Sequence, residues 1–80
     1  MSEKTMAFVL VVVSVGMEYD IAKEIKKIEG VKEIYTTYGS WDIVARLESD
    51  SVKGIEKSVI AIRKISGVEY TETLLCNPVA

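Results

Sequence analysis

Few side chains in this sequence are suited to acid–base or covalent chemistry. The chain has no histidine and one cysteine, Cys76, so histidine-based catalysis, metal binding through histidine and an internal disulfide are excluded. Cys76 has no histidine to activate it, and we expect it to be a plain apolar or exposed residue. Two other groups of residues combine hydrogen-bonding groups at close spacing. They are the run Gly39-Ser40-Trp41-Asp42 and the pair Thr71 and Thr73, which share one face of a strand because they are two residues apart.

Length and charge restrict the class of protein further. The 80 residues make one small domain, which we expect to span residues 1–80. The net charge of −2 does not attract a phosphate backbone, so we expect no direct binding to nucleic acid. The apolar run from Met6 to Val13 is too short to cross a bilayer and is typical of a buried strand. A single cysteine fits the reducing cytoplasm, and the many isoleucine, glutamate and lysine residues favour a thermophilic source.

The hydrophobic pattern predicts the elements that must position these polar residues. Strands are expected at residues 6–15, 31–38, 41–48 and 68–75, and helices at residues 18–28 and 51–65. Gly30 and Gly67 each follow a helix, at the position where a left-handed cap is expected. Gly39-Ser40, between two strand-like runs, predicts a tight type II′ hairpin. Three lysines of the first helix lie off its apolar stripe and predict a solvated face: Lys23, Lys26 and Lys27.

An internal repetition favours one particular fold. Residues 25–31 resemble residues 62–68, because each segment is a helix end, a glycine stop and a strand start. The order strand, helix, strand, strand, helix, strand, together with this repetition, predicts the ferredoxin-like α+β sandwich. Right-handed crossovers then place both helices on one face of a four-stranded antiparallel sheet, with the first and third strands in its centre.

The first strand is apolar on both faces, and this pattern predicts self-association. Its alternating residues form two rows, one of Phe8, Leu10 and Val12 and the other of Val9, Val11 and Val13. We therefore expect the strand to be covered on both faces, whereas two helices cover only one. Monomers rarely expose an apolar patch larger than a few hundred Å². We predict a two-fold dimer of the dimeric α/β barrel type, packed sheet against sheet, with residues 8–13 at its interface.

Several segments of the sequence together resemble a known domain family. They are residues 7–11, 28–31, 38–44 and 65–68, followed by Thr71 and Thr73. These segments are similar to the effector-binding domain of the Lrp/AsnC family, also called the RAM domain, over nearly the whole chain. The most diagnostic part is the hairpin Gly39-x-aromatic-Asp42. Family members usually carry a helix-turn-helix domain first, whereas here the resemblance begins near the N-terminus, so the sequence is similar to a stand-alone RAM domain.

The resemblance implies a role in amino-acid-responsive regulation of transcription. RAM domains dimerise through their sheets, assemble into rings that are typically octamers, and bind an amino acid between dimers, with no cofactor or metal. Such a protein would act by itself or by co-assembly with full-length Lrp-like regulators. In the implied site, the backbone N–H groups of Gly39-Ser40 bind the ligand carboxylate and Asp42 binds its ammonium group. Trp41 forms a wall, and the hydroxyls of Thr71 and Thr73 complete the polar shell.

The same residues also have purely structural interpretations. Gly39-Ser40 is ordinary turn chemistry, and Asp42 is a common polar residue of hairpins. Thr71 and Thr73 are good strand formers. Trp41 is equally suited to packing in a core or an interface.

Other functions of this fold stay open at this point. An ACT-type amino-acid-binding domain has the same fold, and Gly16 in the first strand–helix connection is compatible with it. A ligand-free assembly protein is a further alternative. An enzyme is not expected, because the chain lacks histidine and because Arg46 and Arg63 have no evident partner in a cleft.

Overall fold

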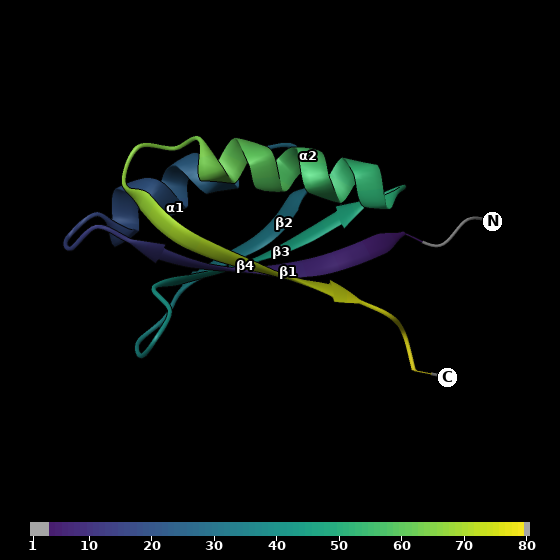
Figure 1. The fold of residues 1–80 in the computed structure, drawn as a ribbon, viewed down its shortest axis with the longest axis horizontal. Helices are drawn as coiled ribbons and strands as arrows, with labels where there is room; N and C mark the ends of the chain where they lie inside the picture. The colour runs from purple at the N-terminus through teal and green to yellow at the C-terminus, as the bar shows by residue number, and fades with distance from the viewer. Residues whose placement is uncertain (1–3, 80) are drawn as a thin grey trace.

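Two helices lie on one face of a four-stranded antiparallel sheet (Figure 1). The computed structural model describes residues 4–79. The elements, in chain order, are β1 (Thr5–Val13), α1 (Glu18–Lys26), β2 (Val31–Thr36), β3 (Ile43–Ser49), α2 (Val52–Arg63) and β4 (Val68–Cys76). The strand order β2-β3-β1-β4 places the first and third strands in the centre. The predicted ferredoxin-like α+β fold is therefore confirmed.

Both helices end earlier than the apolar pattern predicts, α1 at residue 26 and α2 at residue 63. Ile28 and Ile65 continue the apolar stripes, but each lies in a turn after its helix and packs against the core from there. In the first of these turns the Val31 N–H donates to the Ile28 carbonyl over 3.2 Å. Gly30 and Gly67 complete the turns with a φ of 99° each, which residues with a side chain rarely adopt.

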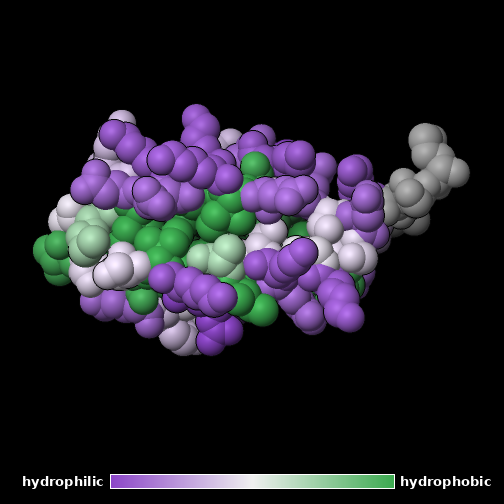
Figure 2. Space-filling view, turned by 90° about the horizontal axis from the view of Figure 1, so that it is seen from above, coloured by the Kyte–Doolittle hydropathy of each residue, from purple (hydrophilic) through white to green (hydrophobic). Residues whose placement is uncertain are grey.

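The helices present a hydrophilic outer surface. Seen from the helix side, polar side chains cover the molecule and apolar side chains are visible between them (Figure 2). Lys23 and Lys26 of α1, and Lys27 directly after it, are exposed, as predicted. Ser51 caps α2, because its Oγ accepts a hydrogen bond from the Gly54 N–H over 3.1 Å. Among the described residues, neither helix is long and apolar enough to cross a membrane.

The connection between β2 and β3 is longer than a two-residue hairpin. Residues 37–42 lie outside both strands, so the predicted type II′ turn at Gly39-Ser40 is wrong. The Thr37 N–H donates to the Asp42 carbonyl over 2.9 Å and closes the loop, while the Asp42 N–H donates to the Val11 carbonyl over 2.9 Å. One bond thus joins Asp42 to Thr37 across the loop and the other joins it to β1, so a six-residue loop rather than a two-residue turn connects β2 to β3.

The first strand also ends early, at Val13 rather than at residue 15. After it the chain turns, with the Met17 N–H donating to the Ser14 carbonyl over 3.1 Å. Gly16 has a φ of 84° in this turn. Val15 lies at the tip of this turn and is fully exposed. This apolar residue therefore does not continue the buried strand.

The core lies between the helices and the sheet. Its members on β1 are alternate residues, each at most 5% exposed: Ala7, Val9, Val11 and Val13. Facing them are buried residues of the two helices: Ile21, Ile25, Ile55 and Ile62. These isoleucines recur at helical spacing, so each helix buries one stripe and leaves the rest in water.

The second row of β1 faces away from the helices. We call this side of the sheet the open face, and its β1 residues Phe8, Leu10 and Val12 are only half-buried. Within one chain β1 is thus covered on one face, not on both. The other three residues of the predicted dimer interface, Val9, Val11 and Val13, lie inside the core of the chain itself.

Candidate functional site

Asp42 fixes the β2–β3 loop (residues 37–42) to the end of β1. Its Oδ2 accepts a hydrogen bond from the Val13 N–H over 2.9 Å, in addition to the backbone bond that Asp42 donates to Val11. Thr37 braces the loop from the other side, because its Oγ1 donates to the Trp41 carbonyl over 2.7 Å. The loop is therefore held at its base by bonds within it and by bonds that reach β1.

The tip of this loop is open to solvent. Gly39 and Ser40 are exposed, and their backbone N–H groups donate to no backbone carbonyl among the described residues. Gly39 has a φ of 131°, and a Cβ added to it would contact nothing within 4 Å. Both N–H groups are thus exposed to solvent, and their binding of a ligand carboxylate stays a prediction.

Trp41 packs against β4 on the open face. Its ring stacks on that of Tyr70, with 5.7 Å between the ring centroids and 19° between the planes. Tyr70 is the register partner of Val12, and so points to the open face. In Figure 1 the loop accordingly projects from the side of the sheet that carries no helix.

Thr71 and Thr73 point to the other side. Their register partners are Val11 and Val9, whose side chains face the helices. The structure therefore brings Gly39, Ser40, Trp41 and Asp42 together in one loop but leaves the threonine pair of the same chain on the opposite face of the sheet. The six predicted ligand-binding residues do not form one pocket within a single chain.

A charged cluster on the open face was missed from the sequence. Arg46 binds Glu33 on β2, with 2.9 Å from Nε to Oε1, and Glu48 on its own strand, with 2.6 Å from Nη1 to Oε2. The hydrogen bond to Glu48, and then that to Glu33, raises the pKa of the Arg46 guanidinium, and the bond to Arg46 lowers the pKa of the Glu48 carboxyl. The spacing of Arg46 and Glu48, two apart on a strand, is the signal that could have found the pair.

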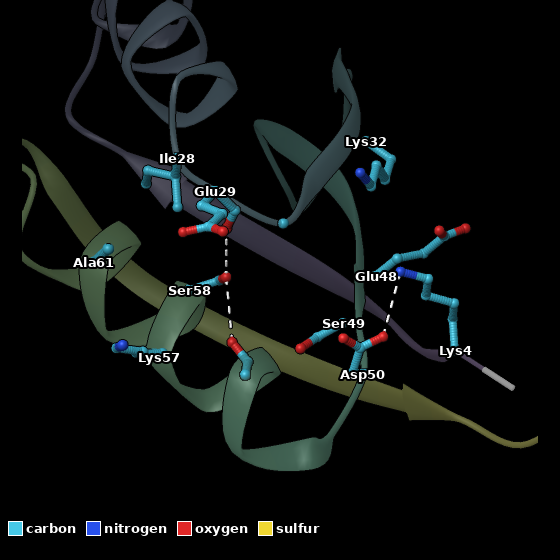
Figure 3. Close-up of a pocket in the computed structure, with 12 residues that line it drawn as sticks. Lys4, Ile28, Glu29, Lys32, Glu48, Ser49, Asp50, Lys57, Ser58 and Ala61 are labelled. Carbon is cyan, nitrogen blue, oxygen red and sulfur yellow. Dashed lines mark hydrogen bonds and ion pairs between the residues drawn. The ribbon is translucent and has the colours of Figure 1, made fainter. Parts of the chain in front are cut away.

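A groove of about 600 Å³ lies at the other end of the sheet from the β2–β3 loop. It is formed by Lys4, the turn after α1, the beginning of β2, the end of β3 with Asp50, and one side of α2 from Gly54 to Ala61, and Figure 3 shows its lining residues. None of the sequence-predicted site residues lines it. Nowhere in residues 4–79 do three metal-binding side chains of the His, Cys, Asp and Glu types come together.

We expect Asp42→Ala to destabilise the chain and Asp42→Asn to do so much less. Alanine leaves the Val13 N–H without its partner, which costs about 1–3 kcal/mol, whereas the asparagine oxygen can still accept that bond. The matched control is Asp50→Ala, because Asp50 is an exposed carboxylate in a surface ion pair with Lys4. Urea denaturation at one protein concentration measures all three, and equal losses for Asp42→Ala and Asp50→Ala would contradict the role of Asp42.

Comparison with known sequences identifies the family. Residues 6–76 match the model of the Lrp/AsnC ligand binding domain. The HTH-type transcriptional regulator FL11 of Pyrococcus abyssi is 30% identical over 70 residues, which are 88% of this chain and 46% of that protein. The chain thus spans about half the length of this curated relative.

Solved structures agree with this match. The protein TTHA0845 from Thermus thermophilus is 30% identical, with a TM-score of 0.89 over 95% of this chain and 96% of that one. The transcriptional regulator NMB0573 of Neisseria meningitidis, solved as a complex with L-Met, has the same fold, with 16% identity and a TM-score of 0.81 over 92% of this chain and 50% of that one. The matched curated proteins are regulators of transcription rather than enzymes. The chain therefore belongs to the Lrp/AsnC family, as a ligand-binding domain of its transcription regulators.

Proposed function

We propose that this chain senses an amino acid and transmits its presence through self-assembly to amino-acid-responsive transcription in the cytoplasm. The observation that carries the proposal is the β2–β3 loop, in which free N–H groups of Gly39 and Ser40 lie three and two residues before a carboxylate held in place by Val13. This pairing of donors with a fixed anion is complementary to the carboxylate and ammonium groups of a free amino acid. The complex of a regulator of the same fold with L-Met supports that ligand class.

The orientation of the threonine pair favours a ligand site between copies. Thr71 and Thr73 of one chain face away from the Trp41 side of its own loop. In the proposed site the polar shell around a ligand at the Gly39-Ser40 tip is therefore completed by another copy. Ligand binding then depends on assembly, and assembly on ligand, as thermodynamic linkage requires.

The open face supports a dimer as the first step of this assembly. Phe8, Leu10 and Val12 form a half-buried row on β1, and Leu74 on β4 is 44% exposed beside it. A second copy packed on this face by two-fold symmetry covers the row. We expect such dimers to build a larger ring, alone or with a full-length regulator of the family.

A thermal-shift screen of the twenty amino acids tests the proposal. Ligand at a hundredfold excess over its Kd stabilises the native state by about 2.7 kcal/mol, so at least one amino acid should raise Tm. Asp42→Asn should remove this response while keeping the bond to Val13, and Asp20→Asn, at an exposed carboxylate of α1, should leave the response unchanged. The proposal fails if no amino acid at millimolar concentration raises Tm, or if Asp42→Asn responds like the natural chain.

A ligand-free assembly protein is the second candidate, and one observation favours it. The Asp42 carboxylate already has a structural partner in Val13, and Trp41 already has one in Tyr70. A loop used only for packing needs these bonds and nothing more. A flat response in the same screen, together with a stable dimer, is the outcome that this candidate predicts.

A further inference from the structure

The outer edge of β4 is free along the length of the strand. β4 is one of the two edge strands of the sheet (Figure 1), and within residues 4–79 no element pairs with its outer side. It has nine residues and pairs with β1 without a register shift from Tyr70 to Cys76. Such an edge exposes a row of backbone N–H and C=O groups, to which a further strand can bind.

The two edges of the sheet differ in their protection against strand addition. β2, the other edge strand, has only six residues, carries the exposed Lys32, and shifts its register between Val31 and Glu33. Short length, lysine and an irregular register are features by which proteins prevent pairing at an edge. The sequence of β4, from Val68 to Cys76, contains no lysine, arginine or proline. Strand addition is therefore hindered at β2 and open at β4.

β4 also exposes apolar side chains on both faces of the sheet. Leu74 is 44% exposed and is the register partner of Phe8 on the open face. Leu75 is 48% exposed and is the partner of Ala7, so it points to the helix side. The proposed sheet-to-sheet dimer covers Leu74 but not Leu75. A strand added beside β4 carries side chains on both faces and covers both leucines.

The hydrogen bonds at the end of β1 show which backbone groups of β4 point outwards. In an antiparallel sheet, successive residues turn their N–H and C=O groups to alternate sides. The Val13 N–H donates to Asp42, on the β3 side, and the Ser14 N–H donates to the Gly67 carbonyl, on the β4 side. Even-numbered residues of β1 therefore face β4, and by the register their even-numbered partners on β4 face β1. The outward backbone groups belong to the alternate residues of β4: Thr71, Thr73 and Leu75.

From this edge we infer that β4 pairs antiparallel with β4 of a second copy, so that two four-stranded sheets become one continuous sheet. A two-fold axis at Thr73 places this residue opposite its own copy and matches Thr71 with Leu75 of the other chain. The outward residues of the two chains are then all paired with one another. The register centred on Glu72 instead places two carboxylates directly opposite each other, which is unfavourable.

The pairing names a contact that can join the proposed open-face dimers, because each dimer presents two free β4 edges. It needs neither a ligand nor the open face, so it can be tested separately from the proposed function. One pair of strands makes a small interface. We therefore expect a Kd on the order of 0.1–1 mM, which is weaker than for the open-face dimer.

Sedimentation of the full chain in ligand-free buffer, from micromolar concentration to about 2 mM, tests the pairing. The natural chain should gain mass above its micromolar species. Thr73→Pro removes an outward N–H but no bond to β1, so the chain should fold and its edge pairing should weaken about tenfold or more. The matched control is Thr36→Pro on β2, where Thr36 is exposed and its N–H also points outwards, since the Thr37 N–H donates to Asp42. This control should associate like the natural chain.

Two further variants separate the possible causes. Thr73→Glu keeps every backbone group but places two carboxylates opposite each other, so it should weaken the pairing about two- to fivefold and decides the matter if Thr73→Pro unfolds. Leu10→Lys lacks the open-face contact and should still gain mass at high concentration, which separates this edge from the proposed dimer. A natural chain that gains no mass up to about 2 mM overturns the inference, and so do equal losses for Thr73→Pro and Thr36→Pro.

Discussion

Leu10→Lys is expected to dissociate the proposed dimer while leaving the chain folded. Leu10 lies in the half-buried row of the open face, and its register partner on β4 is Glu72. In the separated chain the new ammonium group stands opposite a carboxylate and in contact with water, so folding tolerates it. In a sheet-to-sheet dimer the same group is buried against a second copy. Burial of this charge in an apolar interface costs about 3–5 kcal/mol, which weakens association by roughly 10²- to 5 × 10³-fold.

Sedimentation at micromolar concentration measures this effect directly. The matched control is Ile60→Lys, because Ile60 is 52% exposed on α2, in the opposite layer of the molecule. This control should associate like the natural chain. A natural chain that is already monomeric, or a Leu10→Lys chain that stays dimeric, contradicts the interface on the open face.

Ile25→Ala should cause the largest loss of folding stability. Ile25 is 0% exposed and belongs to the core cluster between α1 and the sheet. Truncation of a buried isoleucine to alanine costs about 2–5 kcal/mol, because apolar contacts are lost and a cavity remains. In a domain this small, that loss is a large fraction of the total free energy of unfolding.

Ile60→Ala provides the comparison with the same chemical change at an exposed position. We expect it to cost about 0.5 kcal/mol or less. Chemical denaturation of both variants at one protein concentration keeps the contribution of association equal. Similar costs for the two variants would show that the helix–sheet core does not carry the stability of the chain.

The fold could be predicted from the sequence because the patterns that indicate it lie within short segments of the chain. Isoleucines at helical spacing marked both helices, and Gly30 and Gly67 marked where the chain must turn. The two apolar rows of β1 placed that strand in the centre. The sequence did not predict which of the two rows faces the helices. That choice depends on how the complete sheet is assembled and on which of its faces the helices cover.

The candidate site depends on contacts between segments that are distant in the sequence, and the sequence pattern did not predict these contacts. The bond from Val13 to Asp42 joins residues 29 positions apart and extends the β2–β3 loop, whereas the pattern around Gly39-Ser40 indicated a tight hairpin. The direction of Thr71 follows from its register with Val11 on β1. Neither relation leaves a trace in local spacing, so the placement of these residues could not be predicted from the sequence.

The stacking of Trp41 on Tyr70 gives the protein an internal optical probe. The chain contains a single tryptophan, so its indole emission arises from this one place, where the β2–β3 loop meets the open face of β4. Ligand capture at the loop and burial of the open face would both change the surroundings of that indole. Fluorescence of the unlabelled chain can therefore follow both events in solution, without any added dye.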